Sequence, residues 1–183
     1  MAIIDTIYKA LCACFGLQPS SEEAAALFCE AYPEGESIPQ VPRNKDIIFY
    51  WEEPAPGAKV IPQALADRRV SSFYYPEICR FPEHLLHVTC YGPNALENAE
   101  KIQVLLFLDG GNNPRRILRL EGIYLIPDPA EPLLSYEQEG SRWRKRADIT
   151  IHFRTEEYLT SPVRKQSIVF PPAVQIVNGR GGS

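Results

Sequence analysis

The stretch LLHVTCYGPNALENAEKIQVLLF, residues 85–107, predicts a strand that turns directly into a helix. Residues 85–91 are rich in apolar and β-branched side chains, as strands are. Gly92-Pro93 ends the strand, and Asn94 belongs to the residue types that cap helices. The helix then runs to about Leu108, with one apolar stripe facing the core. That stripe consists of Leu96, Ala99, Ile102 and Leu106.

The C-terminal end of this helix is apolar on more than one side. Val104, Leu105 and Leu108 add apolar side chains to the face that is polar in the first half. We therefore expect this end to be buried on two sides. Core packing and contact with a neighbouring subunit both explain the pattern, so the three residues are candidates for a subunit interface.

A second decisive stretch is SRWRKRADITIHFR, residues 141–154. Its apolar and polar residues alternate from Ala147 to Arg154, which predicts a half-buried antiparallel strand with one solvent-exposed face. Ahead of it we expect a short element at 117–120, a strand at 123–126, a proline-rich turn at 127–132 and a strand from Leu133 towards Glu137.

The N-terminal part predicts two helices and a strand. Residues 3–15 repeat apolar side chains on one helical face, and Gly16 supplies a stop. Ser20 or Ser21 caps a second helix. Its expected buried stripe is Ala24, Leu27, Phe28 and Ala31. The run DIIFYW, residues 46–51, predicts a strand.

These elements predict one α+β domain over residues 1–160, a mostly antiparallel sheet with helices packed on one face. Residues 54–82 are expected to form an insertion or loop region, with a strand at 70–75 as an edge at best. Residues 161–183 are expected to form an extended C-terminal arm containing the β-rich runs 167–170 and 174–177.

Composition narrows the function classes. The 183 residues are 45% hydrophobic and 23% charged, and 17 prolines imply short elements with long connections. The net charge of -4 argues against nonspecific binding to nucleic acid. The sequence contains no run of about 18 apolar residues, so no membrane span is predicted. The N-terminus lacks the features of a signal peptide. The 5 cysteines form no disulfide framework, which favours folding in a reducing cytosol.

No catalytic, cofactor or metal site is expected. His84 and His87 stand three residues apart on the predicted strand and therefore project to opposite faces. The same spacing separates His87 from Cys90, so a thiol nucleophile with a histidine base is not favoured. A small cysteine or metal-dependent hydrolase is the alternative from a different function class.

The basic run from Arg142 to Arg146 is the one notable charge feature. Because an extended segment alternates its side chains, Arg142, Arg144 and Arg146 share one face while Trp143 and Lys145 take the other. We interpret the run as a surface that pairs with acidic groups of another protein or merely solvates the strand, ahead of a nucleic-acid contact, and the three arginines are the candidate polar contact surface.

Residues 83–154 resemble the phage neck (tail terminator) protein family. The similarity begins with the strand, turn and helix at 85–107. It continues through GIYLIPDPAEPLLSYEQEGSRWRKRADITIHF, residues 122–153, as a Gly-x-Tyr strand, a proline turn, a strand, and an Arg-Ala-Asp step into the alternating strand. The matching positions are Tyr91, Gly92, Gly122, Pro127, Trp143, Arg146, Ala147 and Asp148.

The resemblance implies a structural virion protein at the neck or tail top, assembled in the host cytoplasm. Such terminators form a ring, usually a hexamer, that caps the tail tube and joins the tail to the head connector. The implied partners are further copies of the chain, the tube protein, the sheath protein where the tail contracts, and a connector or adaptor protein. Genomic double-stranded DNA would pass through the lumen without specific binding. The main alternative is a head-completion or connector neck protein.

Overall fold

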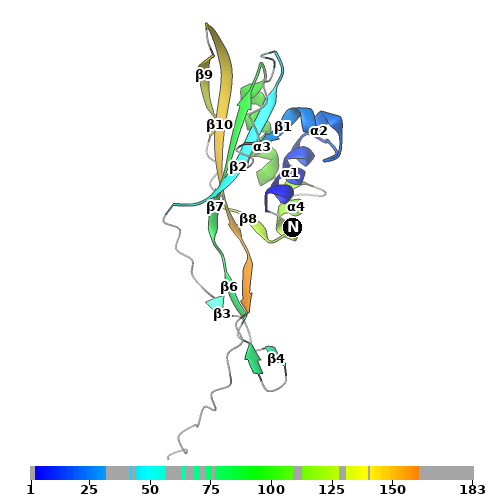
Figure 1. Cartoon of the computed structure of the whole chain (residues 1–183), viewed down its shortest axis with the longest axis vertical. Helices are drawn as coiled ribbons and strands as arrows, with labels where there is room; N and C mark the ends of the chain where they lie inside the picture. The colour runs from blue at the N-terminus through cyan, green and yellow to red at the C-terminus, as the bar shows by residue number, and fades with distance from the viewer. Residues whose placement is uncertain are drawn as a thin grey trace, which may run out of the picture.

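The computed structural model describes residues 3–31, 42, 44–56, 63–64, 68–70, 73–75, 77–108, 113–127, 131–139 and 141–160. Its centre is a six-stranded sheet in the order β1-β2-β7-β10-β8, with β9 also paired to β10 (Figure 1). The strands are β1 (Phe28–Glu30), β2 (Ile47–Pro54), β7 (Glu83–Tyr91), β8 (Ile123–Leu125), β9 (Leu133–Glu139) and β10 (Arg142–Thr155). Every neighbouring pair is antiparallel except β1 with β2, which confirms the predicted fold class.

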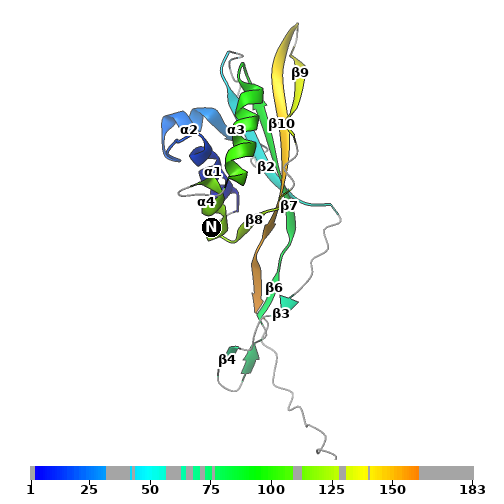
Figure 2. The same cartoon turned by 180° about the vertical axis from the view of Figure 1, so that it is seen from behind.

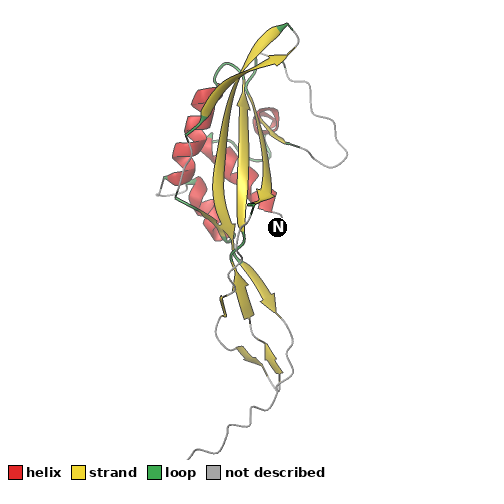
Figure 3. Cartoon of the chain, turned by 90° about the vertical axis from the view of Figure 1, so that its left-hand side faces the viewer, coloured by secondary structure: helices red, strands yellow, loops and turns green. Residues whose placement is uncertain are grey.

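The helices of the described chain lie on one face of this sheet (Figure 2). They are α1 (Ile3–Cys14), α2 (Glu22–Leu27), α3 (Ala95–Phe107) and α4 (Pro114–Leu120). Figure 3 looks onto the opposite face, with the helices behind the strands. We call that side the open face.

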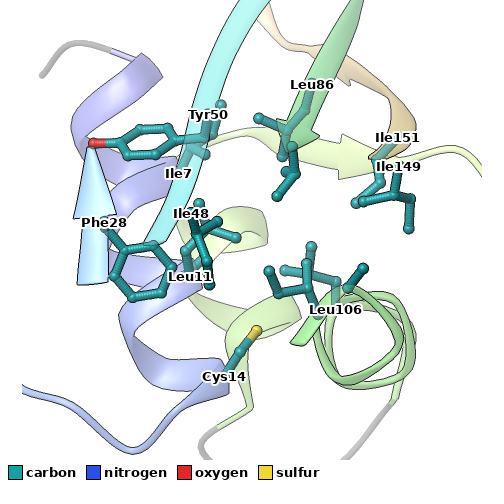
Figure 4. Packing of buried hydrophobic residues seen from close by; sticks show 14 of the residues in the cluster. Ile7, Leu11, Cys14, Phe28, Ile48, Tyr50, Leu86, Leu106, Ile149 and Ile151 are labelled. Atoms are coloured by element: carbon teal, nitrogen blue, oxygen red, sulfur yellow. The ribbon is translucent and has the colours of Figure 1, made fainter. Parts of the chain in front are cut away.

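The core lies between the sheet and the helices. Ile48 of β2, Leu86 of β7 and Ile149 of β10 project from neighbouring strands into the same layer. Figure 4 shows them facing Ile7 and Leu11 of α1 and Leu106 of α3. The predicted period of two in β10 is confirmed. Its buried residues are Ala147, Ile149, Ile151, Phe153 and Thr155.

The turn from β7 into α3 is closed by a residue from another strand end. Asn94 occupies the N-cap position, but its side chain makes no cap hydrogen bond. Instead, Asp46 accepts hydrogen bonds from the backbone N–H of Asn94 (3.0 Å) and from its Nδ2 (2.8 Å). Asn94 therefore stands at the predicted N-cap position, but its side chain donates to Asp46 and does not accept a hydrogen bond from the first turn of the helix.

The strands extend beyond the core at both ends of the molecule (Figures 1 and 3). At one end β10 continues past Tyr91, the last β7 residue it pairs with, and only β9 accompanies residues 142–145. At the other end β11 (Glu157–Thr160) pairs with β6 (Glu77–Arg80), and Gln63–Ala64 (β3) pairs with β6. The Arg80 Nε to Glu157 Oε2 distance there is 2.5 Å.

The second predicted helix is shorter than expected. α2 begins after its Ser21 cap, as predicted, but ends at Leu27. Phe28 to Glu30 instead pair in parallel with β2, and the Phe28 ring contacts the rings of Tyr8 and Phe15 edge to face. The ladder and the aromatic contacts outweigh the helical pattern that continued to Ala31.

Two further predictions need adjustment. The single strand expected at 70–75 is wrong, because Arg68–Val70 (β4) and Phe73–Tyr75 (β5) pair antiparallel with each other. The short element at 117–120 is the second half of α4, which Asn113 caps through its side chain. The C-terminal arm, including the runs 167–170 and 174–177, lies outside the described residues.

Candidate interaction surfaces

Tyr91 is the centre of a polar and aromatic cluster on the open face. Its hydroxyl donates to Glu137 Oε2 at 2.5 Å, which ties β9 to β7 across β10. The Arg144 and Arg146 guanidinium carbons lie 4.8 and 5.6 Å from the centre of the Tyr91 ring, within the range of a cation–π contact. Phe49 of β2 meets the same ring edge to face at 5.9 Å.

These contacts change the proton affinities of the cluster. Burial, followed by the hydrogen bond to Glu137, raises the pKa of Tyr91 to about 12. The hydrogen bond from Tyr91 makes the largest contribution to lowering the pKa of Glu137. Burial opposes this shift, and the contacts with Arg146 add to it. Burial lowers the pKa of Arg146, but the hydrogen bond to Asp148 and the neighbouring charges outweigh it and leave that pKa raised. At neutral pH the cluster therefore holds a neutral phenol between fixed opposite charges.

The three arginines predicted as one contact surface differ in exposure and in whether their guanidinium groups form ion pairs within the chain. Arg146 is paired within the chain, with Nε 2.8 Å from Asp148 Oδ2 and Nη1 3.2 Å from Glu137 Oε2. Arg144 is half-buried over Tyr91, and its Nε and Nη2 have no hydrogen-bond partner in the described part of the chain. Arg142 is exposed near the tip of the hairpin. The alternation of faces predicted from the sequence holds, since Lys145 reaches Pro93 O on the helix side.

The histidines occupy opposite faces of the sheet, as predicted. His87 stacks on Trp51 on the open face, with ring centres 4.9 Å apart, and its Nε2 lies 3.0 Å from Glu53 Oε1. His84 stacks on Phe153 and contacts Glu52 and the buried Thr155. Each imidazole is thus held between a carboxylate and a threonine hydroxyl.

Cys90 lies on the core side, away from His87. It is fully buried, and burial, with a smaller contribution from Asp148, raises the pKa of its thiol to about 12. A reactive cysteine requires the opposite shift together with access for a substrate. Among the described residues, no group of three or more histidine, cysteine or acidic side chains is placed to hold a metal ion.

The apolar end of α3 separates into two parts. Leu105 is half-buried and packs against the core, whereas Val104 and Leu108 are 55% and 49% exposed. Within one chain the prediction of burial on two sides is therefore wrong for Val104 and Leu108. They point away from the sheet because α3 already buries Ala99, Ile102 and Leu106 on its opposite side.

The projecting hairpin, β9 with residues 142–148 of β10, carries further exposed apolar side chains. On its helix side Tyr136 and Trp143 are 62% and 67% exposed, and Leu134 lies beside them. On its open face Leu133 is 68% exposed. Sequence reasoning assigned β9 to a strand without identifying these residues as a surface. The alternation of side chains could be predicted from the sequence. The sequence did not indicate that β9 and β10 extend beyond the neighbouring strands.

A family model described as "Phage neck terminator protein" matches residues 5–177. The match extends beyond residues 83–154, which carried the sequence resemblance, at both ends. The chain matches none of the curated proteins with which it was compared. No helix in the described ranges has the length and apolar character needed to cross a membrane.

Proposed function

Since the chain belongs to the phage neck terminator protein family, we propose that it forms a ring that caps the tail tube and joins the tail to the head connector. The family assignment makes the chain a structural component of the phage neck that interacts with other neck and tail proteins. The observation that carries the finer proposal is the match over residues 5–177, nearly the whole chain.

A ring requires contacts between copies, and the chain has surfaces suited to them. The exposed pair Val104 and Leu108, with half-buried Leu105 beneath, forms an apolar end of α3 that a second copy would cover. The C-terminal arm, residues 161–183, is proposed to lie on a neighbouring copy. Six copies are the proposed ring size.

The remaining partners follow from the position of such a ring. One side would bind the last ring of the tube protein, and the sheath protein where the tail contracts. The other side would bind the connector or adaptor, with Arg142, Arg144 and Arg146 proposed as polar contacts. The net charge of -4 suits a lumen through which DNA slides, because phosphate binding requires an excess of basic residues.

The test is electron microscopy of the purified full chain mixed with isolated tail tubes, combined with native mass spectrometry. We expect density at one end of each tube and a mass equal to six copies. Tubes without caps, or a twelvefold ring, would contradict the terminator role and favour a head-completion or connector protein instead. Tubes mixed with a denatured sample serve as the control.

A further inference from the structure

Two sets of exposed large apolar side chains in the described chain lie on the helix side of the sheet. The first lies at the C-terminal end of α3 and consists of Val104 and Leu108. The second lies on the helix side of the projecting hairpin and consists of Leu134, Tyr136 and Trp143. Leu133 and Tyr124 are exposed on the open face instead. Exposed apolar clusters of this kind mark interaction sites, and tyrosine and tryptophan are the side chains that most often dominate binding energy.

The hairpin needs a supporting surface more than the rest of the sheet does. Among the described residues, Arg142 and Trp143 pair only with β9 beyond the end of β7, and both are exposed. An isolated two-stranded ribbon is marginally stable in water. A partner that covers Tyr136 and Trp143 would supply the packing that this chain does not provide.

The two groups cannot meet within one copy. α3 starts beside the hairpin, where Lys145 reaches Pro93 O, and runs away from it towards α4. Its 13 residues place Leu108 about 20 Å from that start. A head-to-tail contact between copies, in contrast, joins two different patches and repeats around a closed ring.

The charges of the two surfaces are complementary. The helix side of the hairpin carries Lys145 among uncharged residues, whereas the exposed side of α3 carries Glu97, Glu100 and Lys101 beside Val104 and Leu108. The two glutamates leave this side of α3 with an excess of negative charge over Lys101. Opposite charges around apolar contacts favour one docking register over others. The apolar side chains and the opposite net charges of the two surfaces therefore favour a second copy as the occupant.

We propose that the helix side of the hairpin, Tyr136 and Trp143 with Leu134, docks on the exposed side of α3, Val104 and Leu108, of the next copy. The inference deepens the proposed ring by naming both halves of its subunit contact, and so it rests on that proposed function. The contact is heterologous: each copy offers the hairpin to one neighbour and α3 to the other.

The experiment compares the oligomeric state of full-length variants by native mass spectrometry. Trp143→Ser and Val104→Lys are each expected to weaken assembly about tenfold or more and to give folded monomers. Leu133→Ser is the matched control on the hairpin, because Leu133 is as exposed as Trp143 but lies on the other face. It should assemble as the unsubstituted chain does. Tyr136→Ser and Leu108→Lys replace the first pair if either fails to fold.

Mixing the two monomeric variants gives the decisive result. The intact hairpin of Val104→Lys can dock on the intact α3 of Trp143→Ser, so the mixture should form dimers with one copy of each. A mixture that stays monomeric, full assembly of Trp143→Ser, or a monomeric unsubstituted chain would overturn the inference. If the unsubstituted chain still caps tube ends in any of these cases, the proposed function stands and only the assigned contact fails.

Discussion

Gly92 shows how one residue controls the path from β7 to α3. Its φ is +116°, a conformation that residues with a side chain rarely adopt. A Cβ at this position would lie 2.4 Å from Asp46 Oδ1 and 2.7 Å from Lys45 O. The close approach is what lets the Asp46 carboxylate reach Asn94 at the start of the helix.

Gly92→Ala should therefore destabilise the protein by about 3 kcal/mol, through backbone strain and displacement of Asp46. Gly16→Ala is the matched control, because Gly16 also has a positive φ of +69° but nothing lies within 4 Å of its Cβ position. That variant should lose only about 1 kcal/mol. Urea unfolding followed by circular dichroism measures both, and equal losses would refute the role of the Asp46 contact.

The buried thiol of Cys90 leads to a second residue-scale prediction. In the native protein at pH 8, Cys90 should react with iodoacetamide far more slowly than half-buried Cys29, as measured by site-resolved mass spectrometry. Because folding raises the pKa of Cys90 to about 12, its contribution to stability is complete below the ordinary thiol pKa and is lost as the pH rises towards 12. Rapid labelling of Cys90 in the folded state would instead revive the hydrolase alternative.

At the scale of elements, side chains on the open face fasten β9 to the sheet. Among the described strands, only β10 pairs with β9 through the backbone, and the hydrogen bond from Tyr91 to Glu137 links β9 to β7, the strand beyond. Arg146 of β10 also contacts Glu137. β7 and β10, by comparison, pair from Tyr91 with Arg146 to Glu83 with Arg154. The hairpin should consequently open before the core does.

Glu137→Gln should increase hydrogen exchange of the β9 backbone amides while leaving those of β7 unchanged. Because the pKa of Glu137 is lowered in the folded state, its contribution exists above the ordinary glutamate pKa and disappears as the pH falls through the lowered value. The unsubstituted protein should therefore show the same loss of β9 protection in acid. Glu131→Gln, at an exposed residue before β9, is the control. Unchanged β9 exchange in Glu137→Gln would mean that the backbone ladder alone holds the strand.

At the scale of the whole molecule, the parts that stabilise the fold are separate from the surfaces offered to partners. The buried cluster runs from Ile7 to Phe153 and lies between the helices and the centre of the sheet. The projecting hairpin and the β6–β11 pair extend beyond it at opposite ends (Figure 1). Stability and assembly should accordingly respond to different substitutions.

Removal of residues 161–183 tests this separation. Because the buried cluster of the described residues already packs α1, α3 and the central strands together, the shortened chain should keep the Tm of the full chain within a few degrees. If the arm lies on a neighbouring copy, the same deletion should weaken assembly in native mass spectrometry. A large fall in Tm would show that the arm belongs to the domain. Unchanged assembly would contradict its proposed place on a neighbour.

Local patterns in the sequence were sufficient for much of the fold. The period of two from Ala147 to Phe153 predicted the central strand, and the apolar repeats predicted α1 and α3, because periodicity reports which side of an element is buried. The opposite faces of His87 and Cys90 followed from spacing alone. These features depend only on residues within one element.

The tertiary structure decided what depends on residues distant in the chain. Asp46 lies 48 positions before the Asn94 that it caps, and Phe28 joins the sheet because β2 and the rings of α1 surround it. The sequence identified Val104, Leu105 and Leu108 as one apolar end, but only packing against the core separates Leu105 from the exposed pair. The physical reason is that periodicity tells how apolar a face is, whereas the neighbouring elements determine whether that face is covered.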